Sequence, residues 1–179
     1  PDKRVVAQIA PAVRVAIGEE FGLPAGKNSV GKIFAALRML GFDTVFDTSF
    51  SADLTVVEEA SELVYKLENG EKKYPLGNSM PLFTSCCPAW VRFVETKYPE
   101  ILPYVSTCKS PMEMLGAVIK EHYKPADQEA GVETISVAVM PCVAKKYEAA
   151  REEFKRNNVP DVDYVITTKE LILMIKELG

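Results

Sequence analysis

Short apolar segments typical of β-strands alternate along this chain with longer segments in which apolar residues recur at helical spacing. This alternation predicts βαβ units, in which helices join parallel strands and pack on the faces of the sheet. We therefore expect an α/β fold with a mainly parallel twisted sheet and helices on both faces. Strands are expected at 4–10, 42–47, 80–83, 134–139 and 162–166, and helices at 12–21, 29–40, 52–67, 89–97, 111–122, 145–156 and 167–178.

The remaining segments include an expected loop, an irregular segment and an expected helix start. The polar stretch 71–79 is expected to be a loop, and 101–105, which contains Pro103, is either irregular or a short edge segment. Thr167 and Glu170 have the spacing of a capping box, so the last helix is expected to begin there.

Length and charge limit the class of protein. A chain of 179 residues is long enough to bury a core as one domain, and a net charge of −4 disfavours a nucleic acid or an anionic membrane as partner. No apolar run approaches the roughly 20 residues that span a bilayer. The sequence begins with Pro1 and Asp2, without Met or a signal peptide, and ends within a helical pattern. We therefore expect an excised part of a longer protein.

The four cysteines are too few for a disulfide scaffold of this length. Cys86 and Cys87 are adjacent, and adjacent cysteines rarely bridge each other because the ring is strained. A reducing cytoplasm, in which thiols are kept for chemistry, is therefore the expected compartment. No C-x₂-C pair is present, which disfavours a zinc ribbon or a ferredoxin-type cluster.

Cys86, Cys87 and Cys142 each follow an expected strand and precede an expected helix. Sites in parallel α/β folds lie at the carboxyl ends of strands, so the two cysteine segments are expected to converge. A helix N-terminus favours the thiolate, which is the form that binds metal. Lys145 lies one helical turn beyond Cys142, where its ammonium group could meet an anionic ligand. A buried structural role remains the alternative for each thiol, and it is the favoured one for Cys108.

Two further patterns are not expected to be functional. The segment 26–32 has the spacing of a phosphate-binding loop, but Ile33 stands where Ser or Thr should hold magnesium. His122 is the only histidine and lies near an expected helix end, where an exposed, non-catalytic side chain is the simpler interpretation.

Glu59 and Glu62 are three residues apart and share one helix face. Their spacing alone leaves two interpretations open. One is a solvated helix face on which Glu62 pairs with Lys66. The other is a carboxylate relay that passes protons through the fold.

Four segments together resemble the catalytic domain of the [FeFe]-hydrogenases. Thr84-Ser-Cys-Cys-Pro-Ala-Trp90 resembles its first signature, and Met140-Pro-Cys-Val-Ala-Lys-Lys-Tyr-Glu148 resembles its second. The segments 9–14 and 106–111 are similar, in order and spacing, to those before and between the two signatures. The resemblance covers essentially all 179 residues. It implies an enzyme that interconverts protons and electrons with H₂.

The resemblance also implies a cofactor. It is a [4Fe–4S] cluster bridged by cysteine to a di-iron subcluster that carries CO, CN⁻ and an amine-dithiolate, together called the H-cluster. By motif match, Cys87 and Cys142 would be two of the four ligands of the [4Fe–4S] cluster, and Lys145 would hydrogen-bond a cyanide. The residues that would line the di-iron pocket are Ala10, Pro11, Ser110, Met112 and Met140.

The same resemblance assigns proton transfer. Cys86 would be the thiol that passes protons to the bridging amine, and the path to it would run through Glu59, Glu62 and Ser106. This match favours the relay over the solvated face. Cys108 matches no ligand position and is expected to be structural.

The chain also departs from the family pattern. Ala89 stands where Gly is usual, and Met112 stands where a polar Gln or His is frequent, so a hydrogen-bond donor is lost. The third signature, with the other two cluster cysteines, is absent, and so are the ferredoxin-like cluster domains. This piece alone is therefore expected to lack the cofactor and to be inactive.

The expected partners are the remainder of the catalytic domain, the cluster domains, and an electron donor such as ferredoxin or NADH-oxidising subunits. The expected setting is the cytoplasm of an anaerobe. A non-catalytic relative in iron–sulfur assembly, or a sensory hydrogenase, is the alternative. The presence of Cys86 together with Glu59, Glu62 and Ser106 favours the enzyme.

Overall fold

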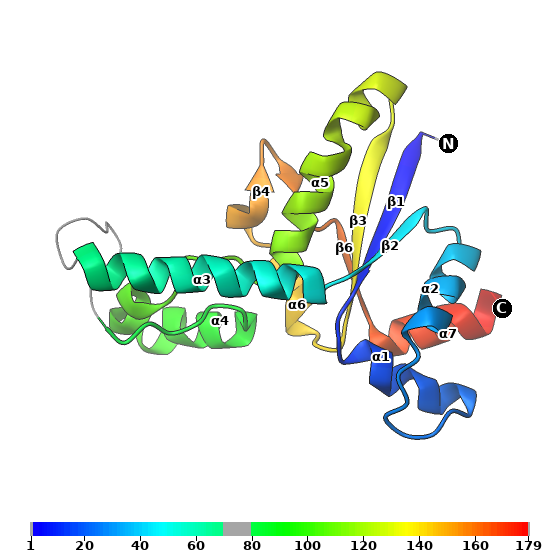
Figure 1. Ribbon diagram of the computed structural model, residues 1–179, viewed down its shortest axis with the longest axis horizontal. Coiled ribbons are helices and arrows are strands. Elements are labelled where there is room, and N and C mark those ends of the chain that lie inside the picture. The colour runs from blue at the N-terminus through cyan, green and yellow to red at the C-terminus, as the bar shows by residue number, and fades with distance from the viewer. Residues whose placement is uncertain (1, 70–79, 179) are drawn as a thin grey trace.

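The fold is built on a four-stranded parallel sheet in the order β2-β1-β3-β6 (Figure 1). Its strands are β1 (Lys3–Ile9), β2 (Thr44–Asp47), β3 (Glu133–Met140) and β6 (Tyr164–Thr167). The computed structural model describes residues 2–69 and 80–178, so the loop expected over 71–79 lies outside the described residues. The parallel sheet confirms the predicted α/β class.

Helices cover both faces of this sheet, as predicted. They are α1 (Val13–Ala16), α2 (Val30–Met39), α3 (Ser49–Asn69), α4 (Pro88–Lys97), α5 (Pro111–Ala130), α6 (Ala144–Ala149) and α7 (Thr168–Leu178), with 3₁₀ turns η1 (Ile17–Phe21), η3 (Pro99–Tyr104) and η4 (Glu152–Phe154). α5 lies on one face, and α1, α2 and α7 lie on the other (Figure 1). Val6 of β1 packs with Leu115 and Ile119 of α5, while Ala7 faces the larger core on the other side. This alternation follows from the two-residue period of a strand.

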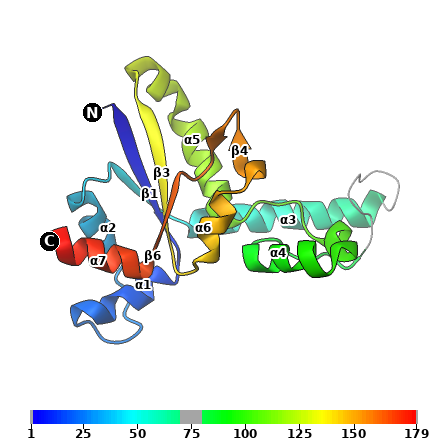
Figure 2. The ribbon, with the colours of Figure 1, turned by 180° about the vertical axis from the view of Figure 1, so that it is seen from behind.

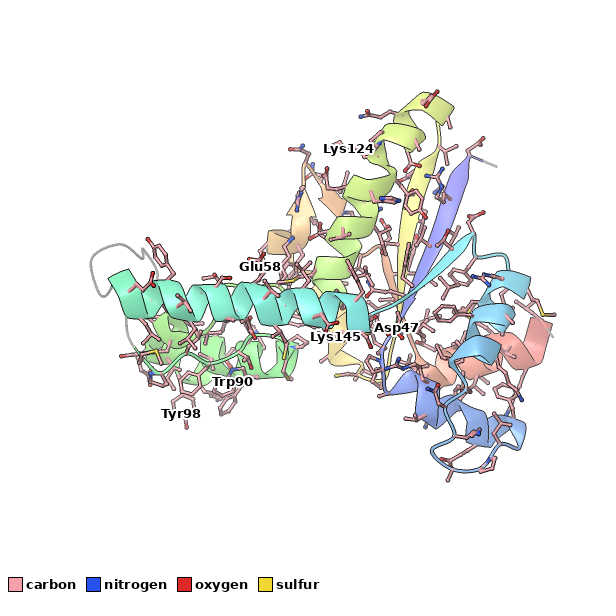
Figure 3. The ribbon with its side chains drawn as sticks, in the orientation of Figure 1. Asp47, Glu58, Trp90, Tyr98, Lys124 and Lys145 are labelled. Atoms are coloured by element: carbon pink, nitrogen blue, oxygen red, sulfur yellow. The ribbon has the colours of Figure 1, made fainter. Side chains whose placement is uncertain are left out.

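α3 and α4 lie side by side and extend away from the sheet (Figures 1 and 2). A row of aromatic rings follows α4. The ring centroids of Trp90 and Phe93 are 6.3 Å apart, and those of Phe93 and Tyr98 are 5.3 Å apart. Trp90 and Tyr98 lie on the side of α4 that faces away from α3 (Figure 3). No helix within the described ranges is long and apolar enough to cross a bilayer.

The capping box predicted for the last helix is confirmed. The Thr167 amide donates to Glu170 Oε2 at 2.6 Å, and the Glu170 amide donates to Thr167 Oγ1 at 3.2 Å. The reciprocal bonds satisfy two backbone donors that a helix start would otherwise leave free. A hydrogen bond from Lys146, and then those of Thr167, lower the pKa of Glu170 to about 2.

The prediction of a strand over 80–83 is wrong. Only Phe83 pairs, with Val105, in an isolated parallel bridge. Pro81 lacks the N–H group that a strand ladder needs, and the apolar run is too short to compensate. The double cysteine therefore follows a single bridge outside the main sheet, and only Cys142 follows a strand of that sheet.

Three helices differ most from the predictions. The helix expected over 12–21 is only the four-residue α1, followed by the 3₁₀ turn η1. α5 continues past residue 122 to Ala130, and α6 ends at Ala149 instead of continuing to 156. After η4 the chain forms a hairpin of β4 (Lys155–Arg156) and β5 (Val159–Pro160). Asn157 and Asn158 connect the two strands with φ angles of 51° and 64°. Asparagine tolerates this left-handed conformation, which suits a tight hairpin turn and ends any helix.

Replacing Gly116 by alanine is expected to destabilise the fold by about 1–3 kcal/mol, because α5 passes very close to the segment after β5. A Cβ atom at Gly116 would lie 2.5 Å from the Asp161 carbonyl oxygen and 2.6 Å from Val162 Cγ2. Urea unfolding of the full-length protein measures the change. Gly31→Ala in α2 is the matched control, since a Cβ there meets nothing within 4 Å. Equal stability of Gly116→Ala and the control would contradict the close approach.

Candidate active site at the two cysteine segments

Cys86 and Cys87 lie where an extended segment meets the start of α4. Cys87 is the N-cap residue, with φ −102° and ψ 108°, and Pro88 occupies the first turn, which suits its fixed φ. The Cys87 side chain makes no capping hydrogen bond, so it leaves the first amides of α4 free for another acceptor. Both thiols are free and exposed.

Lys145 joins the two cysteine segments. Its Nζ donates to the Cys86 carbonyl oxygen at 2.9 Å and to Glu148 Oε2 at 2.7 Å. Lys145 belongs to α6, which begins just after Cys142, and Cys142 follows the carboxyl end of β3. Figure 3 shows Lys145 near the end of the sheet where Asp47 also lies. The predicted convergence of the two segments is therefore seen in the backbone, with the Lys145 ammonium group at their junction.

Glu62 and Ser106 are brought together from distant parts of the chain. Ser106 Oγ donates to Glu62 Oε2 at 2.7 Å, and the Thr107 amide lies 3.3 Å from the same oxygen. Glu62 also forms the predicted ion pair with Lys66, at 3.2 Å between Oε1 and Nζ. Glu62 is only 6% exposed, so the solvated-face interpretation is wrong for this residue.

The neighbouring glutamates of α3 differ in their surroundings. Glu58 is exposed on α3 and is labelled in Figure 3. Glu59 is half-buried, and its Oε1 is buried without a hydrogen-bond partner among residues 2–69 and 80–178. Glu59 precedes Glu62 by nearly one turn, so both carboxyl groups lie on one side of α3.

Cys108 lies between the Glu62–Ser106 pair and the double-cysteine segment. Its Sγ is 3.8 Å from Glu62 Oε2, its amide donates to Ser106 Oγ at 3.1 Å, and its carbonyl accepts from Ser85 Oγ at 2.6 Å. Burial raises the pKa of the Cys108 thiol, and the nearby Glu62 carboxylate raises it further. The thiol is therefore expected to be neutral at pH 7.

A cavity of about 620 Å³ opens beside these groups, between α4, the 106–110 segment and the end of α6. Its walls are largely apolar, and its polar lining side chains include Ser85, Ser106, Ser110 and Glu148. The cavity thus contacts both the Glu62–Ser106 side and the Lys145–Glu148 side of the site.

The residues expected to line a di-iron pocket lie near the carboxyl ends of β1 and β3. Ala10 and Met140 are buried in the main core, and the Ala10 amide donates to the Val139 carbonyl at 3.0 Å. Pro11 follows Ala10 and is exposed. Met112 is 1% exposed and packs in the same core. Ser110 caps α5 and is also buried.

The thiols fit part of the ligand set that a [4Fe–4S] cluster needs. Cys87 and Cys142 are free and exposed on segments that Lys145 holds together, and such clusters take four thiolates. Within residues 2–69 and 80–178, no group of three or more His, Cys, Asp or Glu side chains could hold a metal ion. A cluster with four thiolate ligands would need two more besides Cys87 and Cys142.

The two patterns set aside from the sequence have ordinary structural roles. In the segment 26–32, Asn28 Oδ1 accepts from the Val30 amide at the start of α2. His122 is exposed on α5 and stacks edge-on against Tyr123.

One buried acid was missed from the sequence. Glu113 is fully buried in the first turn of α5, close to Glu148. Ser110 and Glu113 have capping-box spacing, which would have drawn attention to the pair but not to its burial.

The family described as "Iron only hydrogenase large subunit, C-terminal domain" matches residues 3–179. The chain belongs to this family. It is 49% identical over 182 residues to the NADP-reducing hydrogenase subunit HndD of Solidesulfovibrio fructosivorans, with 100% of this chain and 30% of that protein covered. A variant of the [FeFe]-hydrogenase HydA1 from Chlamydomonas reinhardtii superimposes with a TM-score of 0.85 at 43% identity, covering 99% of this chain and 43% of that one.

The chain is also similar to proteins that are named as iron–sulfur cluster assembly factors and not as hydrogenases. The cytosolic Fe-S cluster assembly factor narfl of Xenopus tropicalis is 32% identical over 182 residues, which cover 99% of this chain and 37% of that protein. The chain spans less than half the length of each of these relatives.

Proposed function

We propose that this chain is part of the catalytic domain of an [FeFe]-hydrogenase, which interconverts 2H⁺ and 2e⁻ with H₂. The observation that carries the proposal is the Lys145 hydrogen bond to the Cys86 carbonyl, which joins the two cysteine segments beside the buried Glu62–Ser106 pair. The hydrogenase names of the relatives support the reaction.

Cys87 and Cys142 are the residues that would hold the [4Fe–4S] cluster from this chain, with the other two thiolates supplied from outside it. When bound, the H-cluster would supply the iron chemistry of the reaction and a route for electrons from the donor. Lys145 would donate a hydrogen bond to a cyanide ligand, and Ala10, Pro11, Ser110, Met112 and Met140 would surround the di-iron unit. The 179-residue chain alone is expected to hold no stable cluster and to make no H₂.

Protons would travel through side chains of this chain. Glu59 and Glu62, nearly one turn apart on α3, would both carry the proton. Ser106 donates to Glu62 Oε2, so its hydroxyl is placed to exchange a proton with that carboxylate. Cys86 would carry the proton over the last step. General acid–base groups of this kind typically contribute about 10²–10⁴-fold to a rate.

The partners would be the rest of the catalytic domain, ferredoxin-like cluster domains, and ferredoxin or an NADH-oxidising subunit as electron donor. HndD is named as a subunit of an NADP-reducing hydrogenase, which supports a multi-subunit setting. A reducing cytoplasm suits four free thiols.

H₂ evolution from a reduced electron donor tests the function in the full-length protein after the cofactor is installed. Turnover supports the enzyme. A protein that holds the [4Fe–4S] cluster but makes no H₂ would favour the assembly or sensory role.

Replacing Cys87 or Cys142 by alanine is expected to lower the bound iron and remove the electron-paramagnetic signal of the reduced cluster, because each change deletes one of four thiolate ligands. The measurement is iron content and the spectrum of the reconstituted full-length protein. Cys108→Ala is the matched control and is expected to keep both. Equal iron in all three variants would contradict the ligand assignment.

A further inference from the structure

Glu113 is a buried acid whose carboxyl group has no hydrogen-bond partner. It is 0% exposed, and neither Oε1 nor Oε2 accepts a hydrogen bond from any residue in the described part of the chain. Ser110 Oγ accepts from the Glu113 amide at 3.4 Å, but the reciprocal bond of a capping box is not made. The side chain therefore serves no capping role that would explain a carboxyl group here.

The charged groups around Glu113 are already paired with one another. Lys109, which precedes α5, pairs with Asp161 after β5, and Lys145 of α6 pairs with Glu148. Among the charged side chains, these four have the largest influence on Glu113. Two cations and two carboxylates balance, so an ionised Glu113 would be an unbalanced negative charge in a buried site. Burying an unpaired charge is unfavourable, and a buried acid avoids it by keeping its proton.

We propose that Glu113 is a positioning residue that stays protonated at neutral pH and thereby leaves Lys145 bound to Glu148 and to the Cys86 carbonyl. Ionised Glu113 competes with these two acceptors for the Lys145 ammonium group. Lys145 then releases the Cys86 carbonyl, and the double-cysteine segment loses this hydrogen bond to α6. Glu113 acts through Lys145 and does not itself contact Cys86.

The direction of the pKa shift agrees with this geometry. Burial raises the pKa of Glu113 to about 8, the carboxylates Glu148 and Asp161 add to the rise, and Lys109 and Lys145 oppose it. Between pH 4.5, the ordinary value, and about 8, the folded protein holds a proton that the unfolded chain has lost. The contribution of this group to stability is therefore full below pH 4.5 and is lost as pH rises to about 8.

Infrared spectroscopy of the full-length protein tests the protonation state directly. Wild type is expected to show the band of a protonated carboxyl group well below pH 8, and to lose it with a midpoint near pH 8. Glu113→Gln is expected to lack this band at neutral pH, where ordinary carboxyl groups are ionised. Glu121→Gln is the matched control, because Glu121 lies exposed on the same helix, and it should keep the band. If Glu113→Gln fails to fold, Glu113→Met provides a second neutral side chain. Absence of the band from wild type at neutral pH would overturn the proposal.

The pH profile of H₂ evolution tests the positioning role, which rests on the proposed function. Glutamine mimics the neutral acid, so the ratio of Glu113→Gln turnover to wild-type turnover should be constant below pH 8. Above it, the ratio should rise about tenfold for each pH unit as wild-type Glu113 ionises. The ratio for Glu121→Gln should stay constant throughout.

The outcomes separate the two claims. A constant Glu113→Gln ratio across pH 8 would overturn the positioning role, even if the infrared band is present. A wild-type protein with cofactor but without H₂ evolution would overturn the proposed function. The infrared result would then still decide whether Glu113 is protonated.

Discussion

Replacing Cys86 by serine is expected to lower H₂ turnover of the full-length protein by about 10²–10⁴-fold, the usual contribution of a positioned acid–base group. The hydroxyl is nearly the same size as the thiol but is a much weaker acid, so it releases and accepts protons poorly at neutral pH. The measurement is the rate of H₂ evolution with a saturating reduced electron donor.

The internal control for this variant is the cofactor. Cys86 is not an expected ligand, and its carbonyl, not its thiol, accepts from Lys145. Iron content and the electron-paramagnetic signal should therefore match wild type. Normal turnover in Cys86→Ser would contradict the proton-transfer role. Loss of iron would show instead that the Cys86 thiol helps to hold the cluster.

Replacing Glu62 by alanine is expected to lower the free energy of unfolding by about 3–5 kcal/mol, the usual cost of removing one partner from a buried ion pair. The change deletes the carboxylate that faces Lys66 and accepts from the Ser106 hydroxyl. Urea unfolding of the full-length protein measures the loss.

Two further variants separate stability from proton transfer. Glu62→Gln keeps the shape of the side chain but cannot carry a proton as a carboxylate does. The variant should still fold, and its H₂ turnover should be lower by about 10²–10⁴-fold. Glu58→Gln, one turn away on α3 and exposed, is the matched control and should change neither property. Full activity in Glu62→Gln would exclude Glu62 from the proton path.

The parts of the fold that could be predicted depend on local patterns. Two-residue and 3.6-residue periods in the sequence predicted the sheet strands and most of the helices because they arise within single segments. The capping box at Thr167 and Glu170 was predicted for the same reason. The failures occurred where a local pattern competes with a partner elsewhere. The apolar run 80–83 has only Val105 to pair with, and the helical pattern after Ala149 gives way to a hairpin.

The candidate site shows the same division. Motif match predicted roles for Cys87, Cys142 and Lys145, and the family model places the chain in the family of the iron-only hydrogenase large subunit, C-terminal domain. Spacing did not distinguish exposed Glu58 from buried Glu62, since both lie on one helix. Only the packing of α3 against the 106–108 segment places Ser106 on the Glu62 carboxylate.

The sequence by itself therefore determined the class of fold, the family and the residue types that could carry the chemistry. These depend on the spacing of apolar residues within single segments and on short motifs. The tertiary structure alone decided which charges face one another. Glu113 is the clearest case, since its burial raises the pKa of its carboxyl group and the carboxylates Glu148 and Asp161, from other parts of the chain, raise it further. A side chain's charge state depends on its burial and on its neighbours, and packing sets both.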